Sequence, residues 1–424
     1  MHSESAIAGL EAALADLRGV VGADHVRPAA AQDAIDGVVP STFVEPANAE
    51  EMSRVLKIAT AAGLHVSPRG NGSKMEWGNP PRSADLIVST RRLNRVVEHA
   101  WADMTATVEA GCTVAQFQQT LAQHGQRVAL DPLWPEQATI GGILATNDSG
   151  PLRIRFGSLR DLIIGITLAL PDGTLAKSGG KVVKNVAGYD LPKLATGSLG
   201  TLGIITQAIF RLHPIFRESH TLTFSLPDRQ AMSGLLLAIL DSRLVPTGLQ
   251  IRAGNGGGLH IDIRFEGTST GCDAQCEQIR QMAAELESGE ARNVWNDTES
   301  LWSAAPCVAK ISLLPSELGA FLDNVKRFTE PLHLAWTAVV QGVGVGFLRV
   351  ESESVAPLMG VLGELRQWLE SRGGSLVLLR APLKLKQEVD VWGSAGDAMP
   401  LMKNIKARFD PAGTLNPGRF IGGI

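Results

Sequence analysis

The chain has 424 residues, of which 44% are apolar and 19% charged, a composition typical of a soluble globular protein. This length exceeds what one ordinary hydrophobic core supports, so at least two domains are expected. The net charge of −4 and the lack of a long lysine and arginine run argue against nucleic-acid binding. No apolar stretch reaches the length of a membrane-spanning helix, and the first residues do not resemble a signal peptide. Only four cysteines occur, which favours a reducing compartment.

The first part of the chain alternates segments of helical and strand character. Apolar residues at helical spacing predict helices over 5–20 and 47–62, and Gly63 ends the second. The next predicted elements are strands over 85–90 and 106–110, a helix over 114–121 and a strand over 161–170. This mixture predicts a domain with both helices and sheet.

A short glycine-rich turn, Pro68–Lys74, lies between the second helix and the strand at 85–90. Its two glycines, Gly70 and Gly72, allow a tight bend that turns several backbone N–H groups toward one point. Such a concavity suits a phosphate or a pyrophosphate. The alternative is a glycine-rich surface turn without a ligand.

Two further stretches are rich in small residues. Residues 129–150 form a long irregular segment of Gly, Pro, Thr and Asn, and long segments of this kind inside a compact domain are usually functional. Residues 197–206 space their glycines three apart and then become β-branched. The second run also fits a plain strand entry softened by glycine.

After about Pro214 one pattern of elements occurs twice: strand, helix, strand, strand, helix. The first copy spans 221–286 and the second 310–368, and a strand at 376–379 follows. This order predicts a duplicated split βαβ unit, arranged as two antiparallel sheets with helices on one side. A helix over 399–408 and an irregular closing segment end the chain.

Several known motifs fail. Met75 stands where a dinucleotide fingerprint would need a third small residue. Gly267–Gly271 matches the hydrolase pattern Gly-x-Ser-x-Gly around Ser269, although a strand-to-helix turn with Thr270 or Asp273 near the N-cap explains it as well.

Metal chemistry is not expected. Cys272 and Cys276 lie one helical turn apart, but no second pair or nearby histidine completes a zinc site. No histidine occurs beyond His333, so the closing segment offers neither a histidine ligand nor a histidine base.

Four stretches with these features follow one another in a characteristic order and together resemble the flavoproteins of the vanillyl-alcohol oxidase/PCMH type. They are 68–74, 138–150, 197–206 and 409–419. Gly-Tyr-Asp-Leu at 188–191 and Leu-Val-Leu-Leu-Arg-Ala-Pro at 376–382 resemble most the FAD-binding subunits of bacterial glycolate oxidase complexes.

The resemblance implies an α+β fold in three parts. A PCMH-type FAD-binding domain of two α+β subdomains would cover residues 1–214, and a cap domain of antiparallel sheet with helices would cover 215–395. A C-terminal segment, 396–424, would return to the FAD domain. The residues implied to contact FAD are Pro68, Arg69, Gly70, Asn71, Gly72, Ser73, Pro132, Thr139, Gly141, Gly142, Asn147, Ser149, Gly150, Ile204 and Asn416.

The chain departs from the family pattern at several points. Relatives that link FAD covalently often carry histidine in the glycine turn, whereas this turn has Ser73, so the implied FAD is non-covalent. Leu199 stands where related catalytic 2-hydroxy acid dehydrogenases usually have Gly-Ser-Glu-Gly, and their histidine-rich motif is missing.

The implied function is that of an FAD-binding subunit in a glycolate oxidase or dehydrogenase complex. Such a subunit would oxidise glycolate or D-lactate to the 2-oxo acid and pass electrons to a paralogous FAD subunit and an iron–sulfur subunit. Arg380 and Lys384 are candidates for binding the substrate carboxylate. The alternative is a non-catalytic subunit that holds flavin or relays electrons. The expected location is the cytoplasm, with the inner membrane reached only through partners.

Overall fold

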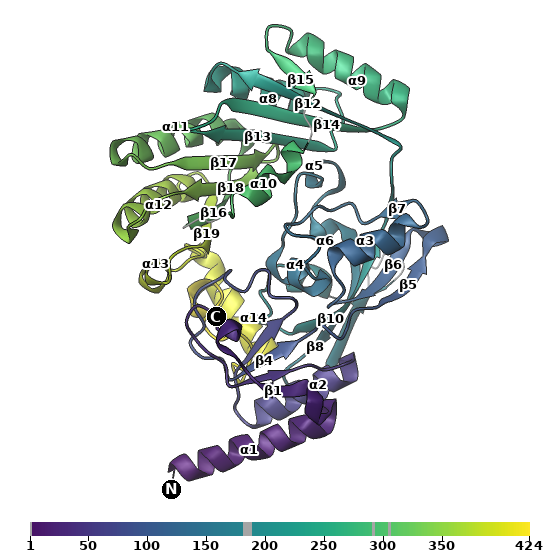
Figure 1. Cartoon of the computed structure of the whole chain (residues 1–424), viewed down its shortest axis with the longest axis vertical. Helices are drawn as coiled ribbons and strands as arrows, with labels where there is room; N and C mark the ends of the chain where they lie inside the picture. Colours follow the sequence, from purple (N-terminus) through teal and green to yellow (C-terminus); the bar gives the residue numbers. More distant parts are fainter. Residues whose placement is uncertain (1, 181–188, 291–292, 304–306) are drawn as a thin grey trace. The chain divides into compact units, whose positions relative to one another are not determined.

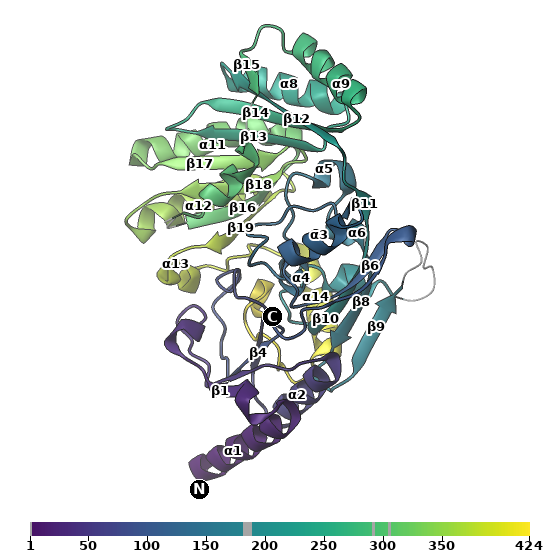
Figure 2. The same ribbon diagram turned by 45° about the vertical axis from the view of Figure 1, so that its right-hand side comes forward.

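The computed structural model describes residues 2–180, 189–290, 293–303 and 307–424. The chain folds into two compact units (Figure 1, Figure 2). Unit 1 comprises Met1–Asp148, Ser158–Pro214 and Ser394–Ile424, and unit 2 comprises Ser149–Gly157 and Ile215–Gly393. Each unit therefore combines segments that are far apart in the sequence.

Unit 1 begins with two helices and a four-stranded sheet of order β1-β2-β4-β3, in which only β1 runs antiparallel to its neighbour. The helix α2 starts where the Asn48 side chain accepts a hydrogen bond from the backbone N–H of Glu51. The predicted helices over 5–20 and 47–62 and the strand over 85–90 are confirmed. The bounds are α1 (His2–Val21), α2 (Ala49–Ala61), β1 (Val26–Pro28), β2 (Thr42–Val44), β3 (Val66–Arg69) and β4 (Leu86–Ser89).

The second sheet of unit 1 is antiparallel and has the order β5-β6-β10-β8-β9. The helix α3 packs against it through Phe117, whose ring centroid lies 5.9 Å from that of Phe210 on β10. The predicted strand over 161–170 starts later than expected, because residues 159–162 form a short helix. The bounds are β5 (Val96–Ala100), β6 (Thr105–Glu109), α3 (Val114–Ala122), α6 (Leu159–Leu162), β8 (Ile163–Ala169), β9 (Leu175–Gly179) and β10 (Ile204–Arg211).

The stretch at 129–150, predicted to be irregular, contains the helix α4 (Ile140–Thr146). Thr139 caps this helix by accepting a hydrogen bond from the N–H of Gly142 at 3.2 Å. Asn147 ends it in the left-handed conformation, with φ of 48°. Two glycines in seven residues hide the helical period, which is why the sequence did not reveal the helix.

Unit 2 is one antiparallel sheet of order β15-β12-β14-β13-β17-β18-β16-β19 with helices α8, α9, α11 and α12. The repeated order of elements is confirmed. The bounds are β12 (Glu218–Leu226), α8 (Arg229–Asp241), β13 (Gly248–Gly254), β14 (Leu259–Gly267), α9 (Ser269–Met282), β15 (Ser288–Glu290), β16 (Cys307–Ser312), α11 (Leu318–Thr329), β17 (Trp336–Gln341), β18 (Val345–Val350), α12 (Val355–Glu370) and β19 (Ser375–Arg380).

The prediction of two separate sheets is wrong. The strands β13 and β17 pair antiparallel from Gln250 opposite Gln341 to Gly254 opposite Thr337, and this pairing joins the two copies. Each copy would otherwise leave one of these strands as an open edge. Backbone pairing between distant strands depends on no particular side chain, so the order of elements could not predict it.

The sheet of unit 2 has two unlike faces because side chains alternate along each strand. Ile251 and Ile261 point into a large apolar core that also includes residues of α8, α9, α11 and α12. On the opposite face, Asp262 is buried but hydrogen-bonded to Thr223, Gln250 and Arg252. One face therefore builds the core, and the other carries polar groups.

The remaining elements are short, apart from α14 in unit 1. Among the residues described, no helix combines the length and the apolar character that crossing a bilayer requires. The other bounds are β7 (Gln126–Arg127), α5 (Arg153–Phe156), α7 (Leu191–Ala195), β11 (His213–Pro214), α10 (Asp297–Ser300), α13 (Leu383–Glu388) and α14 (Met399–Phe409), with single turns η1 (Ala23–His25), η2 (Ala31–Asp33), η3 (Trp101–Asp103), η4 (Val294–Asn296), η5 (Pro315–Glu317), η6 (Glu330–Leu332), η7 (Gly396–Ala398) and η8 (Ile421–Gly423).

The core of unit 2 gives a first prediction. Phe224 on β12 is fully buried, so Phe224→Ala should lower the free energy of unfolding by about 3–5 kcal/mol. Leu401 is 63% exposed, and Leu401→Ala should change it by less than about 0.5 kcal/mol. Urea unfolding followed by circular dichroism measures both. Equal midpoints for the two variants would contradict the described core.

Candidate FAD site

The glycine turn Pro68–Lys74 begins within the last two residues of β3 and packs against the start of α4. A Cβ atom on Gly70 would lie 2.2 Å from the Oγ1 atom of Thr139, so any side chain at position 70 would collide with the helix cap. Gly72 has φ of +84°, which L side chains rarely adopt. Both glycines are therefore required by the backbone path, and the turn is held against α4.

A second turn closes the site from another side. Leu199 and Gly200 both have positive φ, of 52° and 70°, and Leu199 donates its N–H to the carbonyl of Ala145 at the end of α4. A Cβ atom on Gly200 would lie 3.1 Å from the Pro68 ring. The first residues of the run at 197–206 thus line one side of the site, and the strand β10 begins at the end of this run.

The closing segment of the chain supplies the third wall. Residues Thr414–Asn416 pair in parallel with Val66 of β3. The N–H group of Val66 donates to the carbonyl oxygen of Thr414, and the N–H group of Asn416 donates to the carbonyl oxygen of Val66. The Asn416 side chain donates through Nδ2 to the carbonyl of Leu199 at 2.7 Å, while its buried Oδ1 atom has no hydrogen-bond partner. Buried polar atoms normally have a partner, so Oδ1 offers an acceptor for a ligand.

These segments enclose a small pocket within unit 1. Its volume is about 80 Å³, well below the roughly 300 Å³ of a small ligand pocket, so it would hold only part of a dinucleotide. The predicted residues that line it are Pro68, Gly70, Asn71, Gly72, Ser73, Thr139, Gly142 and Asn416. Backbone N–H groups and small residues dominate this set, and that chemistry fits a diphosphate.

Arg69 does not line the pocket, because its side chain turns to Asp33. Its Nη1 atom lies 2.7 Å from Asp33 Oδ1, and Arg27 bonds the other carboxylate oxygen at 2.9 Å. The hydrogen bond from Arg27, with those from the Ala30 N–H and Arg69, lowers the pKa of Asp33 to about 2 despite its burial. The charge of Arg69 is thus balanced within the protein.

Six other predicted residues also lie outside the pocket lining. Gly141 packs α4 against the residue that follows β6, since a Cβ atom there would lie 2.9 Å from Ala110 Cβ. Asn147 ends α4, and Ile204 is a core residue at the start of β10. Pro132 is buried in unit 1, whereas Ser149 and Gly150 belong to unit 2.

Seven further residues line the pocket that were not predicted from the sequence. Arg419 is 2% exposed and donates to the carbonyl oxygens of Met75, at 2.6 Å, and Trp77. Arg419 is the last residue of the closing stretch 409–419, and its place in that stretch was the only hint in the sequence that it belongs to the site. The missed residues are Lys74, Met75, Ala145, Thr146, Leu199, Gly200 and Arg419.

The candidate catalytic residues Arg380 and Lys384 belong to unit 2. Arg380 ends β19, donates through Nη1 to the carbonyl of Trp302 at 2.5 Å, and lies over the Trp302 ring at 5.3 Å. Lys384 is exposed on α13. Arg380 is therefore held in one orientation, and Lys384 is surrounded by solvent.

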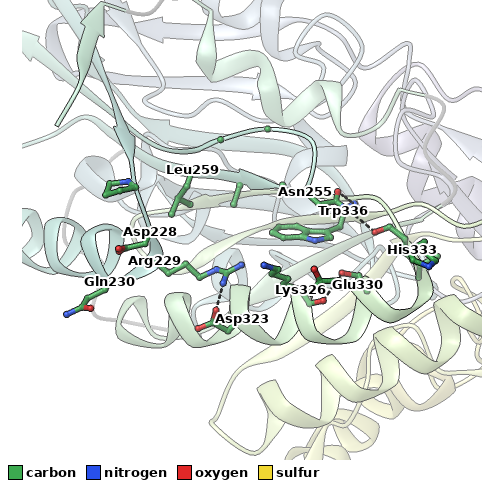
Figure 3. A pocket seen from close by; sticks show the side chains of 17 residues that line it. Asp228, Arg229, Gln230, Asn255, Leu259, Asp323, Lys326, Glu330, His333 and Trp336 are labelled. Atoms are coloured by element: carbon green, nitrogen blue, oxygen red, sulfur yellow. Dashed lines mark hydrogen bonds and ion pairs between the residues drawn. The ribbon is translucent and has the colours of Figure 1, made fainter.

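Unit 2 has a large open pocket beside α8 and α11, with a volume of about 990 Å³ (Figure 3). Its charges alternate in sign, and Arg229 is paired with Asp323. Asn255 bonds the backbone of both Leu334 and Trp336 at 3.0 Å. The pocket offers no surface of a single charge, and we assign no ligand to it.

Other candidate chemistry has a structural explanation. Ser269 is the first residue of α9, and the cap of this helix is Thr268. Burial raises the pKa of Cys112 to about 11 and that of Cys307 to about 12, which makes both thiols poor nucleophiles. Among the described residues, no three His, Cys, Asp or Glu side chains are grouped to hold a metal ion. Gly188 of the Gly-Tyr-Asp-Leu stretch lies outside the described residues.

Sequence comparison agrees with this geometry. Residues 40–179, which contain the glycine turn and α4, match the family described as FAD binding domain. The chain is 32% identical over 212 residues to glycolate oxidase subunit GlcD of Bacillus subtilis, covering 50% of this chain and 45% of that protein. It is 31% identical over 227 residues to a D-lactate dehydrogenase of Archaeoglobus fulgidus, covering 54% and 50%. The chain thus spans about half the length of these relatives.

Solved structures share the fold of nearly the whole chain. p-Cresol methylhydroxylase with bound substrate superposes with a TM-score of 0.78 at 16% identity, covering 97% of this chain and 96% of that one. Alkyldihydroxyacetonephosphate synthase gives 0.71 at 19% identity, covering 94% and 84%. The fold is that of the PCMH-type flavoproteins.

The Asp33 carboxylate gives a prediction on acid stability. Its pKa is about 2 in the folded protein and 3.8 without the fold, so its contribution is complete above pH 4 and disappears as the pH falls through 2. We expect Asp33→Asn to be less stable than the wild type by on the order of 2 kcal/mol at pH 5, with the gap closing by pH 2. Urea titrations across this range measure it, and a gap independent of pH would refute the assignment.

Proposed function

We propose that the chain binds FAD non-covalently and oxidises a small 2-hydroxy acid, glycolate or D-lactate, to the 2-oxo acid. When bound, FAD supplies the acceptor for the hydride that leaves the carbon bearing the hydroxyl group. The observation that carries the proposal is the convergence of the glycine turn, the α4 cap and Asn416 on one pocket within a family-matched FAD binding domain.

The residues of unit 1 would hold the cofactor through backbone donors. The N–H groups of Gly70, Gly72 and Ser73 would bind the diphosphate, and Asn416 Oδ1 would accept a hydrogen bond from the flavin side. The turn 68–74 contains neither histidine nor cysteine, which supports a dissociable cofactor. Contacts by Arg69, Pro132, Gly141, Asn147, Ser149, Gly150 and Ile204 are proposed from the family resemblance alone.

Two observations support the substrate class. The relatives that match half of the chain are named as a glycolate oxidase subunit and a D-lactate dehydrogenase. A 2-hydroxy acid carries a carboxylate, and Arg380, fixed by the Trp302 carbonyl, would bind it better than the exposed Lys384. Electrons would leave through partner flavin and iron–sulfur subunits of a glycolate oxidase complex in the cytoplasm.

Anaerobic flavin reduction tests this function. The purified chain, loaded with FAD, should lose its flavin absorption on addition of glycolate or D-lactate but not of acetate, which has no hydroxyl group to oxidise. Acid precipitation should release the flavin into the supernatant. Bleaching by the assembled complex but not by the chain alone would favour the second candidate, a subunit that holds flavin without catalysing the reaction.

The contact between Gly70 and Thr139 gives a prediction on FAD affinity. Gly70→Ala places a methyl group 2.2 Å from Thr139 Oγ1, so the turn must shift and FAD should bind at least about 10-fold more weakly. Adding Thr139→Ala removes the two closest atoms, Oγ1 and Cγ2, and leaves Cβ at 3.1 Å, so it should restore part of the loss. Gly19→Ala in α1, where nothing lies within 4 Å, is the matched control. Fluorescence titration with FAD measures all of them, and unchanged affinity in Gly70→Ala would exclude this site.

A further inference from the structure

Lys74, the last residue of the glycine turn, lies in a closed polar and aromatic cage. Its Nζ atom is 3.2 Å from Asp148 Oδ2 and 3.3 Å from the carbonyl oxygen of Leu133. The rings of Trp77 and Trp134 flank it, with centroids at 5.6 and 5.3 Å. The Lys74 and Asp148 side chains are only 5% and 2% exposed, so the ion pair is shielded from solvent.

The cage joins the segments that form opposite walls of the pocket. Lys74 lines the pocket from the glycine turn, whereas Asp148 follows α4, whose residues line the other side. Asp148 also accepts the N–H of Leu133 at 3.0 Å, so one carboxylate fixes the turn and the segment that leads to α4. Trp134 lies in the segment that leads to α4 and has φ of 54°. Its carbonyl oxygen accepts hydrogen bonds from the N–H groups of Gln137 and Ala138.

A buried ion pair of this kind adds little net stability, because removing both charges from water offsets most of their attraction. It does impose one geometry on the groups it joins, since either charge without the other would be buried uncompensated. The ammonium is already neutralised by Asp148, so its own charge adds little attraction for an anionic ligand.

We propose that Lys74 and Asp148 are positioning residues, which set the spacing between the glycine turn and α4 before the diphosphate of FAD binds. This inference rests on the proposed use of the pocket for FAD. It assigns to Lys74 and Asp148 an effect on the binding of the diphosphate group of FAD and not of its flavin ring. Preorganisation of this kind increases affinity because the site is ordered before the ligand arrives.

The test compares three ligands on full-length variants. FAD and ADP share a diphosphate, whereas riboflavin has none. Lys74→Met and the doubly neutral K74M/D148N variant should each weaken FAD and ADP binding by the same factor, about 10- to 100-fold, and leave riboflavin affinity unchanged. Lys74→Met alone leaves the Asp148 carboxylate buried without its cation, which could prevent folding. The double variant has no buried charge at this pair, so it keeps the test decisive. Lys193→Met, at an exposed pair with Asp190, is the matched control.

Two further readouts separate positioning from other roles. The ³¹P NMR shifts of bound FAD should change in K74M/D148N but not in Lys193→Met. Asp148→Asn, which leaves the ammonium without its anion, should also weaken ADP. Tighter ADP binding in Asp148→Asn, or equal losses for riboflavin and FAD, would overturn the proposal. If the wild type binds neither FAD nor ADP, the proposed function itself fails.

Discussion

Unit 1 depends on the backbone pairing between β3 and the closing segment of the chain. Val66, the first residue of β3, exchanges hydrogen bonds with Thr414 and Asn416, at 2.8 and 2.9 Å, two residues before the glycine turn begins. Without this pairing Asn416 would not reach Leu199, and the pocket would lack a wall. A parallel edge contact between residues nearly 350 positions apart therefore creates the site.

A half-buried lysine, Lys406, keeps this pairing in register. Lys406 on α14 donates to the carbonyls of Thr201 and Leu415 and to Asp410, whose carboxylate in turn accepts the N–H groups of Thr414 and Leu415. Burial lowers the pKa of Lys406, and Asp410 opposes that shift. The same ammonium thus connects the closing segment with the run at 197–206.

Two of the cations near the pocket are balanced by carboxylates of the protein itself. Arg69 is paired with Asp33 and Lys74 with Asp148. Because these two charges are already compensated, the attraction for the proposed diphosphate would come mainly from oriented backbone N–H groups and from Arg419. This explains why the glycines, rather than the basic residues, carry the motif. Unit 2 uses a different principle, in which one sheet buries an apolar face and carries hydrogen-bonded polar groups, such as Asp262, on the other.

The sequence was sufficient for local features with a local physical cause. Helical and strand periodicity located α2, β4 and the repeated elements of unit 2, because the spacing of buried side chains is set within each element. The steric freedom of Gly70 and Gly72 marked the turn for the same reason. The sequence could not give the single eight-stranded sheet, the turn of Arg69 toward Asp33, or the cage around Lys74. Those features come from backbone edges and buried charges that meet only when distant segments pack, so no spacing along the chain encodes them.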